Sequence, residues 1–217
     1  AFVSAIGSAV SYFFGEKNKD HSWAKLRRLF FVLHSAAVVG IFISLYYIIQ
    51  NHLFEYHYAW QHSNKALPTR YMISCFWEGQ EGSFLLWMFW HSILGIILLF
   101  RSKAWESSVM AVVSFAQIIL GSMLLGLPIG EVTIGSSPFN LMRDVLDAPI
   151  FQKENYMTFI QDGSGLNPLL QNYWMVIHPP TLFLGFASSV VPFAFSVAGL
   201  WRGKFTQWIR AAMPWTL

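Results

Sequence analysis

Long apolar stretches without formal charge alternate with polar segments along the whole chain. Four of the stretches are long enough, or nearly so, to cross the about 30 Å of hydrocarbon in a bilayer. They cover residues 29–50, 84–100, 108–127 and 180–200, and a shorter one, residues 1–14, is typical of the end of a further span. A soluble core rarely houses so many such stretches. The pattern predicts an all-α, polytopic bundle of about five transmembrane helices.

Composition supports the membrane prediction. Of the 217 residues, 55% are hydrophobic and only 12% are charged, about half the charged share of a soluble domain. This argues against a soluble enzyme and a disordered chain, and the lone Cys75 excludes an intrachain disulfide. We interpret Cys75 as a small buried residue rather than a reactive thiol. Because the chain starts at Ala1 and ends in an apolar run, we expect it to be a fragment.

The charged residues divide the polar segments into two classes. Residues 15–28, 101–107 and 201–213 hold ten basic and three acidic residues, whereas residues 51–83 and 128–179 hold four basic and eight acidic ones. Short basic loops stay in the cytoplasm. We therefore predict that the two long, extended loops lie on the outer face. The basic charge then reflects membrane topology, with the lipid bilayer as partner and no nucleic acid.

The first external loop ends in a short polar motif, WEGQEGS, at residues 77–83. Gly79 and Gly82 allow tight turns, and Ser83 is placed to cap a helix that starts at the next residue. Glu81 would then lie near the positive end of that helix dipole. The motif is typical of a capped helix entry, and the alternative is a polar ledge that contacts a ligand or partner.

The second external loop ends at His178, directly before Pro179 and Pro180. A following proline disfavours the helical region for His178, and prolines suit the first turn of a helix. The sequence thus predicts an imidazole held at the membrane surface beside Tyr173 and Trp174. Such an imidazole suits haem iron. A helix-entry histidine with an ordinary hydrogen bond is the alternative that the residues alone leave open.

The remaining histidines fall into two groups. His52, His57 and His62 recur every five residues, a spacing that places all three on one face of neither a helix nor a strand. We expect exposed loop histidines there rather than a metal site. His34 and His91 lie inside spans, where ionisable groups are candidates for function. They predict either a haem-ligating pair or interhelical hydrogen bonds.

Taken together, these motifs resemble the CcmF-like family of cytochrome c maturation membrane proteins, a haem-handling group with NrfE and CcsA. The resemblance covers residues 29–217. Glu78 and Gln80 depart from the family pattern, which usually has Gly and His there. The family's tryptophan-rich segment and later histidines, including the ligands of a structural b-type haem, would follow residue 217. The matching residues are Ser63-Asn64, Leu67-Pro68, Tyr71, Trp77, Glu81 to Trp87, Leu166 to Gln171, His178-Pro179-Pro180, Gly185 and Pro214-Trp215-Thr216.

The resemblance implies haem lyase function. Such proteins present haem b at the periplasmic face of the bacterial inner membrane for thioether attachment to apocytochrome c. It also implies a haem chaperone and thiol-reducing, apocytochrome-binding subunits as partners. His178 becomes an axial ligand of the haem iron, while Trp77, Glu81, Asn167 and Trp174 line the pocket or support its loops. No catalytic residue is assigned. We expect residues 1–217 alone to be inactive as a holocytochrome c synthase.

Two other function classes compete with this interpretation. A transporter or ion-translocating subunit needs charged or broken helices at mid-membrane, and the spans offer only His34, His91 and a candidate kink at Pro192. A structural subunit of another membrane complex would need none of the outer-face motifs. The haem absorbance of the intact protein separates these classes from haem handling.

Overall fold

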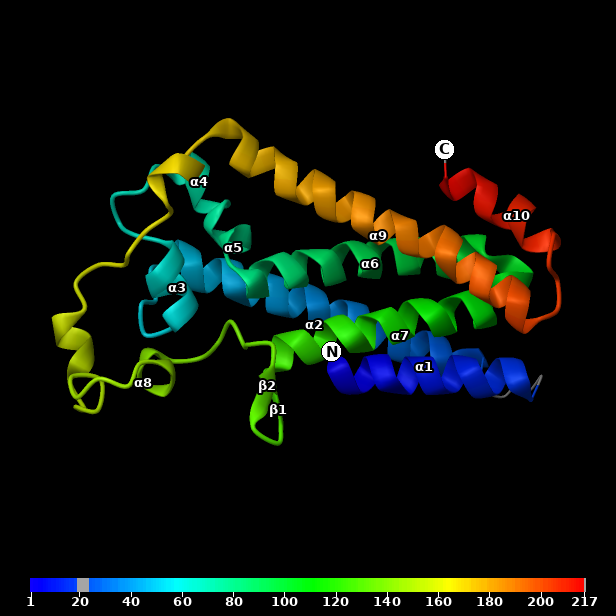
Figure 1. The fold of residues 1–217 in the computed structure, drawn as a ribbon, viewed down its shortest axis with the longest axis horizontal. Coiled ribbons are helices and arrows are strands. Elements are labelled where there is room, and N and C mark those ends of the chain that lie inside the picture. The colour runs from blue at the N-terminus through cyan, green and yellow to red at the C-terminus, as the bar shows by residue number, and fades with distance from the viewer. Residues whose placement is uncertain (19–23, 217) are drawn as a thin grey trace. The chain divides into compact units, whose positions relative to one another are not determined.

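The computed structural model describes residues 1–18 and 24–216, and within them it is mostly helical (Figure 1). Lys19 and Asp20 of the first basic segment lie outside the described residues. The long helices are α1 (Phe2–Lys17), α2 (Ala24–Gln50), α6 (Gln80–Arg101), α7 (Glu106–Leu125) and α9 (Tyr173–Trp201).

The predicted all-α, polytopic membrane class is confirmed. In the described part of the chain, four helices (α2, α6, α7 and α9) are long and apolar enough to cross a membrane. The fifth long helix, α1, has 16 residues, fewer than the about 20 that a span needs. The structure therefore supports four candidate spans plus one shorter apolar helix.

The two loops that we expected to be extended consist largely of short elements. The first holds α3 (His57–His62), α4 (Thr69–Met72) and α5 (Cys75–Glu78). The second holds the hairpin β1–β2 (Leu127–Ile129 and Val132–Ile134), then α8 (Met142–Val145), η3 (Tyr156–Phe159) and η4 (Pro168–Leu170). The remaining elements are η2 (Lys103–Trp105), α10 (Gln207–Ala212) and η5 (Met213–Trp215).

The chain forms two compact units. Unit 1 contains residues 1–40, 87–122 and 182–217, and unit 2 contains residues 41–86 and 123–181. The core of unit 1 is formed by large side chains from several helices, among them Tyr12, Phe31 and Phe195, none more than 1% exposed. Many large side chains that point outward from this unit are also apolar.

This exposed apolar surface fits lipid rather than water. Phe115 is 60% exposed, Phe193 is 58% exposed and Leu200 is 65% exposed. Contiguous apolar surface of this kind is rare on soluble monomers, whereas a hydrocarbon environment accommodates it. Polar contacts lie inside unit 1 instead, such as the Ser8 and Ser114 hydroxyls, whose oxygens are 2.8 Å apart.

His34 and His91 lie at the same level of unit 1. Helices α2 and α6 run in opposite directions (Figure 1), and a Cβ atom added at Gly95 would lie 2.2 Å from the Phe31 ring. One turn away along each helix, His34 is 0% exposed and His91 is 2% exposed. His34 Nδ1 lies 2.9 Å from the Ala1 carbonyl oxygen. Neither nitrogen of His91 has a hydrogen-bond partner in the described residues. Haem ligation by His34 and His91 stays a prediction.

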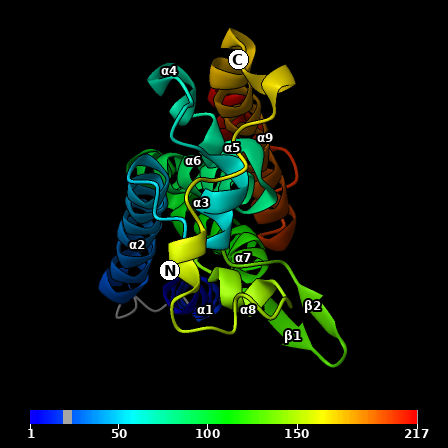
Figure 2. The ribbon, with the colours of Figure 1, turned by 90° about the vertical axis from the view of Figure 1, so that its left-hand side faces the viewer.

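In unit 2 the two long loops pack against each other. Tyr56 and Leu141 form an isolated β-bridge, beside which the Met142 amide donates to the Glu55 carbonyl oxygen at 2.9 Å. Further along, the Ser164 amide donates to the Trp60 carbonyl oxygen at 2.7 Å. Figure 2 shows these elements from the side of the loops, with α8 below α3 and the yellow segment after η3 passing in front of α3. The predicted outer-face motifs therefore belong to one folded unit.

Candidate functional site

The WEGQEGS motif forms the end of one helix and the start of the next. Helix α5 ends at Glu78 and α6 begins at Gln80, four residues earlier than we expected. The prediction that Ser83 caps a helix starting after it is therefore wrong. Ser83 lies inside the first turn, and its hydroxyl donates to the Trp77 carbonyl oxygen at 2.9 Å. Glu81 does lie in the first turn of α6, near the positive end of its dipole.

Gly82 serves a close approach rather than a turn. A Cβ atom at this position would lie 1.6 Å from the Phe76 carbonyl oxygen. That carbonyl accepts a hydrogen bond from the Tyr58 hydroxyl at 2.8 Å, and the Gly79 amide donates to the same hydroxyl at 3.1 Å. Burial raises the pKa of Tyr58, so the phenol keeps the proton that it donates. The absence of a side chain at Gly82 allows the start of α6 to approach the Phe76 carbonyl of α5 and the Tyr58 hydroxyl of α3.

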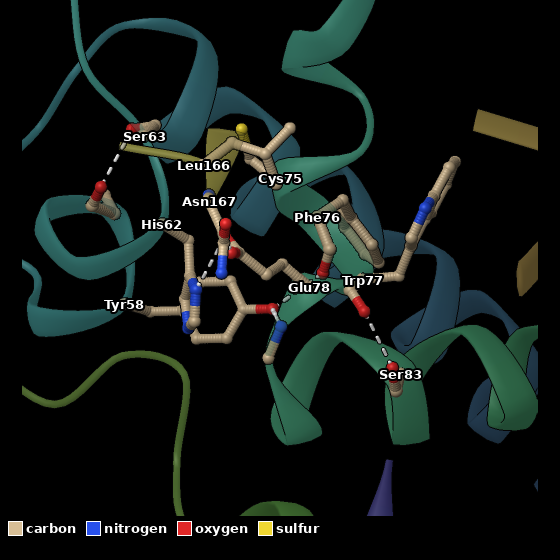
Figure 3. A network of polar contacts seen from close by, with 12 residues as sticks. Tyr58, His62, Ser63, Cys75, Phe76, Trp77, Glu78, Ser83, Leu166 and Asn167 are labelled. Atoms are coloured by element: carbon tan, nitrogen blue, oxygen red, sulfur yellow. Dashed lines mark hydrogen bonds and ion pairs between the residues drawn. The ribbon is translucent and has the colours of Figure 1, made fainter. Parts of the chain in front are cut away.

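Glu78 joins the two long loops. One carboxylate oxygen, Oε2, lies 3.0 Å from His62 Nδ1, and the other, Oε1, accepts the backbone N–H of Asn167 at 3.2 Å (Figure 3). The side chains of His62 and Glu78 are 12% and 13% exposed. Glu78 stands where the resemblance described above predicts glycine. Its carboxylate holds the Asn167 segment.

The prediction of three exposed loop histidines is wrong. His52, His57 and His62 are all partly buried, and the last two lie on α3. Burial lowers the pKa of His57, and the negative charge of Glu81 opposes this shift. No group of three or more His, Cys, Asp or Glu side chains placed to hold a metal ion occurs in residues 1–18 and 24–216.

The Leu166–Gln171 motif is a capped turn. The Asn167 side chain accepts the Leu169 amide at 3.0 Å, and Gln171 Nε2 donates to the Leu166 carbonyl oxygen at 3.0 Å. Leu166 is buried at 2% exposure, whereas Asn167 is exposed. Asn167 thus fixes η4 with its side chain and reaches Glu78 with its backbone, and its predicted place in a haem pocket stays a prediction.

Cys75 lies behind this network and is 0% exposed. Burial, reinforced by the negative charge of Glu78, raises the pKa of its thiol to about 12. Only the thiolate is strongly nucleophilic, so Cys75 acts as a buried packing residue.

We expect Glu78→Ala to loosen the Asn167 segment. The change removes the acceptor of the Asn167 amide and the partner of His62, at a cost of about 2 kcal/mol in local stability. Amide hydrogen exchange of residues 164–170 measures the loss. Glu154→Ala is the matched control, because Glu154 is an exposed carboxylate of the same unit. Equal exchange in both variants would contradict the role given to Glu78.

Helix α9 begins earlier than predicted. It starts at Tyr173, with the Asn172 side chain accepting the Met175 amide at 3.2 Å as an N-terminal cap. His178 and the prolines that follow lie in the second turn, inside the helix. The expectation of a non-helical His178 at a helix entry is therefore wrong.

Trp77 explains why the helix tolerates this position for proline. Pro179 has no N–H, so the Met175 carbonyl four residues earlier loses its intrahelical donor. Trp77 Nε1 donates to that Met175 carbonyl oxygen at 2.8 Å. Trp77 is 6% exposed, and its indole therefore anchors the first turns of α9 to the WEGQEGS motif.

A double-mutant cycle tests this exchange of donors. We expect Trp77→Phe to destabilise the first turns of α9, with about 1 kcal/mol of the loss arising from the hydrogen bond. In a Pro179→Ala background the backbone N–H of the new alanine can donate to the Met175 carbonyl. Trp77→Phe should then lose only its packing contribution, without the cost of the hydrogen bond. Amide exchange of residues 175–178 measures both steps. Equal effects of Trp77→Phe in the two backgrounds would show that the indole acts by packing alone.

The His178 side chain is exposed and makes no hydrogen bond with the described residues. His178 is exposed, as is Thr181 one turn later, and Trp174 one turn earlier is 69% exposed. Trp174 and Tyr173 form an edge-to-face pair with ring centroids 5.8 Å apart. The imidazole has no hydrogen-bond partner among the described residues. Both of its nitrogens are therefore available to a ligand.

The structure brings some of the predicted site residues together. Trp77 binds the Met175 carbonyl, and the next residue, Glu78, binds the Asn167 amide. His178 and Trp174 lie on the exposed start of α9, the helix that Trp77 anchors. The sequence alone did not predict that Tyr58, His62 and Glu78 form hydrogen bonds within unit 2. For Glu78 a signal existed in the resemblance, which predicts glycine at that position.

Comparisons with known proteins confirm the predicted family resemblance. Residues 77–214 match the family described as Cytochrome C assembly protein. The chain is 31% identical over 203 residues to cytochrome c-type biogenesis protein CcmF of Haemophilus influenzae, covering 93% of this chain and 28% of that protein. It is 29% identical over 222 residues to CcmF of Pseudomonas fluorescens, covering 100% and 30%.

Further matches extend the set. The chain is 30% identical over 166 residues to NrfE of H. influenzae, covering 76% of this chain and 23% of that protein. The solved structure named Cytochrome c Heme Lyase CcmF superposes with a TM-score of 0.73 at 20% identity, covering 99% of this chain and 31% of that one. The fold is shared, and the chain spans less than a third of the length of these relatives.

Proposed function

The chain belongs to the cytochrome c assembly protein family that includes CcmF, CycK and NrfE, and from this premise we propose that unit 2 presents haem for attachment to apocytochrome c. The chain is a multi-pass membrane protein of that family. Haem b is the substrate in this proposal, delivered to the site and passed on to the apocytochrome.

The free imidazole of His178 carries the proposal. It is an exposed histidine without a partner among the described residues, on the second turn of a helix whose start is fixed by Trp77. Histidine is a common axial ligand of haem iron. The exposed rings of Tyr173 and Trp174 offer flat apolar surface beside it, which fits a porphyrin. The residues present thus fit one side of a haem site.

The supporting network would fix the orientation of the haem. Trp77 holds the Met175 carbonyl, and Glu78 holds the Asn167 amide. A rigid ligand keeps the reacting groups aligned, and such alignment can lower a reaction barrier by several kcal/mol, of the order of 7 kcal/mol in favourable cases. We assign Trp77 and Asn167 as positioning residues and leave Glu81 as a polar neighbour at the start of α6. A second axial ligand would come from another part of the assembly.

The charge bias of the loops supports an outward-facing site. Unit 2 carries the acidic external loops, so the haem site would face the periplasm from the bacterial inner membrane. Apocytochrome c, a haem chaperone and thiol-reducing subunits would approach from that side. The chain would then act as one part of a haem lyase complex.

The absorption spectrum of the full-length protein tests the function. We expect protein purified from membranes to carry haem with a low-spin spectrum, and His178→Ala to reduce the fraction attributable to the processed haem. A transporter or a structural subunit would show no dependence of haem content on His178. An unchanged spectrum in the variant would exclude His178 as a ligand.

A further inference from the structure

One end of unit 1 holds a polar cavity far in sequence from the haem-site residues. The cavity has a volume of about 460 Å³ and is lined at its mouth by Arg101, Lys103 and Arg210. They come from the end of α6, from η2 and from α10. This volume lies within the range of small-molecule sites. Trp105 and Phe195, with ring centroids 6.4 Å apart, form its apolar wall.

No carboxylate of the described residues lines this cavity. Within the part of unit 1 that the structure describes, the only acidic side chains are Glu16 and Glu106. Glu106 accepts from Arg28 Nε at 2.7 Å, and Glu16 accepts from Arg202 Nη2 at 2.6 Å. Both carboxylates are therefore already paired with other arginines. Arg101, Lys103 and Arg210 at the cavity therefore have no carboxylate counterion among the described residues of unit 1.

Ser102 also lines the cavity. Ser102 is 4% exposed, and its Oγ has no hydrogen-bond partner in the described residues. Buried polar groups are nearly always hydrogen-bonded, so an unpartnered one points to a missing ligand. A hydroxyl donor together with arginine and lysine donors matches the acceptor oxygens of a phosphate group.

We propose that the cavity formed by Arg101, Ser102, Lys103 and Arg210 binds a phosphate group. Arg101 ends an apolar helix of 22 residues, so the cavity lies at the level where a bilayer meets water. Basic pockets at this level bind the headgroups of anionic lipids. The same donors suit a soluble phosphate compound. In either case, the Trp105 and Phe195 rings would contact the organic part of the ligand.

The double variant Arg101→Gln/Arg210→Gln tests the site in the full-length protein. Native mass spectrometry counts the phosphatidylglycerol molecules retained by protein from mixed phosphatidylglycerol and phosphatidylcholine nanodiscs. We expect the variant to bind this lipid about tenfold more weakly, since each nearby cation contributes to headgroup binding. Lys17→Gln/Lys25→Gln is the matched control, because it removes the same charge from exposed residues of the same unit that do not line the cavity.

Ser102→Ala separates a built site from general attraction by charge. The variant keeps every cation and costs no hydrogen bond within the described protein. We expect it to weaken binding several-fold. In a second arm, inorganic phosphate is titrated into protein in pure phosphatidylcholine nanodiscs, and thermal unfolding is recorded. Protection by phosphate that depends on Arg101 and Arg210 would support the same site with a soluble ligand.

The outcomes are distinct. Loss of phosphatidylglycerol binding in the cavity variants alone assigns the site to a lipid headgroup. Phosphate-dependent protection without lipid selectivity assigns it to a soluble phosphate compound. If the cavity variants and the lysine control lose binding equally, or if neither ligand binds the wild type, the proposal is overturned. Far-UV circular dichroism checks that each variant is folded.

Discussion

We expect His178→Ala to lower holocytochrome c formation by the full-length protein by about tenfold or more, while the amount of protein in the membrane stays unchanged. The imidazole is exposed and makes no hydrogen bond within the described residues, so its removal costs little folding energy. In the proposed haem site, by contrast, the same change would remove one of the bonds that hold the haem iron. Changes around metal ligands commonly cost 10-fold to about 100-fold in affinity or activity. Haem-stained gels of the secreted cytochrome measure the result.

The controls separate ligation from general damage. His57→Ala removes a partly buried imidazole of the same unit and should leave maturation near the wild-type level. Added imidazole should partly restore haem in the His178→Ala protein by occupying the vacated position. His178→Met should retain some haem, because thioether sulfur also ligates iron. Normal maturation by the His178→Ala protein would contradict the proposal that His178 ligates the haem iron.

Gly82→Ala destabilises unit 2 by about 3 kcal/mol. The new methyl group would lie 1.6 Å from the Phe76 carbonyl oxygen and 2.5 Å from the Tyr58 hydroxyl. A backbone carbonyl cannot rotate away as a flexible side chain can. The Tyr58 hydrogen bond to Phe76 must therefore break or the start of α6 must shift. Unfolding of the purified protein in detergent, followed by near-UV circular dichroism, measures the loss.

Gly185→Ala is the matched control for this substitution. No heavy atom of the described residues lies within 4 Å of a Cβ built at Gly185, and the residue lies within helix α9. Alanine is the better helix former by about 0.5 to 1 kcal/mol, so this variant should be as stable as the wild type or slightly more stable. A Gly82→Ala protein as stable as Gly185→Ala would refute the close approach inferred at Gly82.

Local sequence features predicted much of this molecule. The apolar stretches located α2, α6, α7 and α9, because a helix in lipid must present apolar side chains along its length. The charge pattern separated the basic segments from the acidic ones. The His-Pro-Pro and WEGQEGS motifs marked the regions where the structure places its exposed histidine and its polar network.

Helix boundaries were less predictable. Local rules placed the start of the last span after His178, because proline disfavours the helical conformation for the residue before it. The structure continues the helix through Pro179 because Trp77, 98 residues earlier than Met175, supplies the missing donor. Glu78 likewise reaches an amide that is 89 residues away.

The sequence by itself therefore determined which segments are apolar enough to cross a membrane and which residue types are available for chemistry, since both follow from the character of consecutive residues. Only the tertiary structure decided which groups meet. The pairing of Glu78 with His62 and Asn167 depends on how the two long loops fold against each other. The freedom of His178 has the same origin, because a side chain is available to a ligand only when no distant part of the chain satisfies it first.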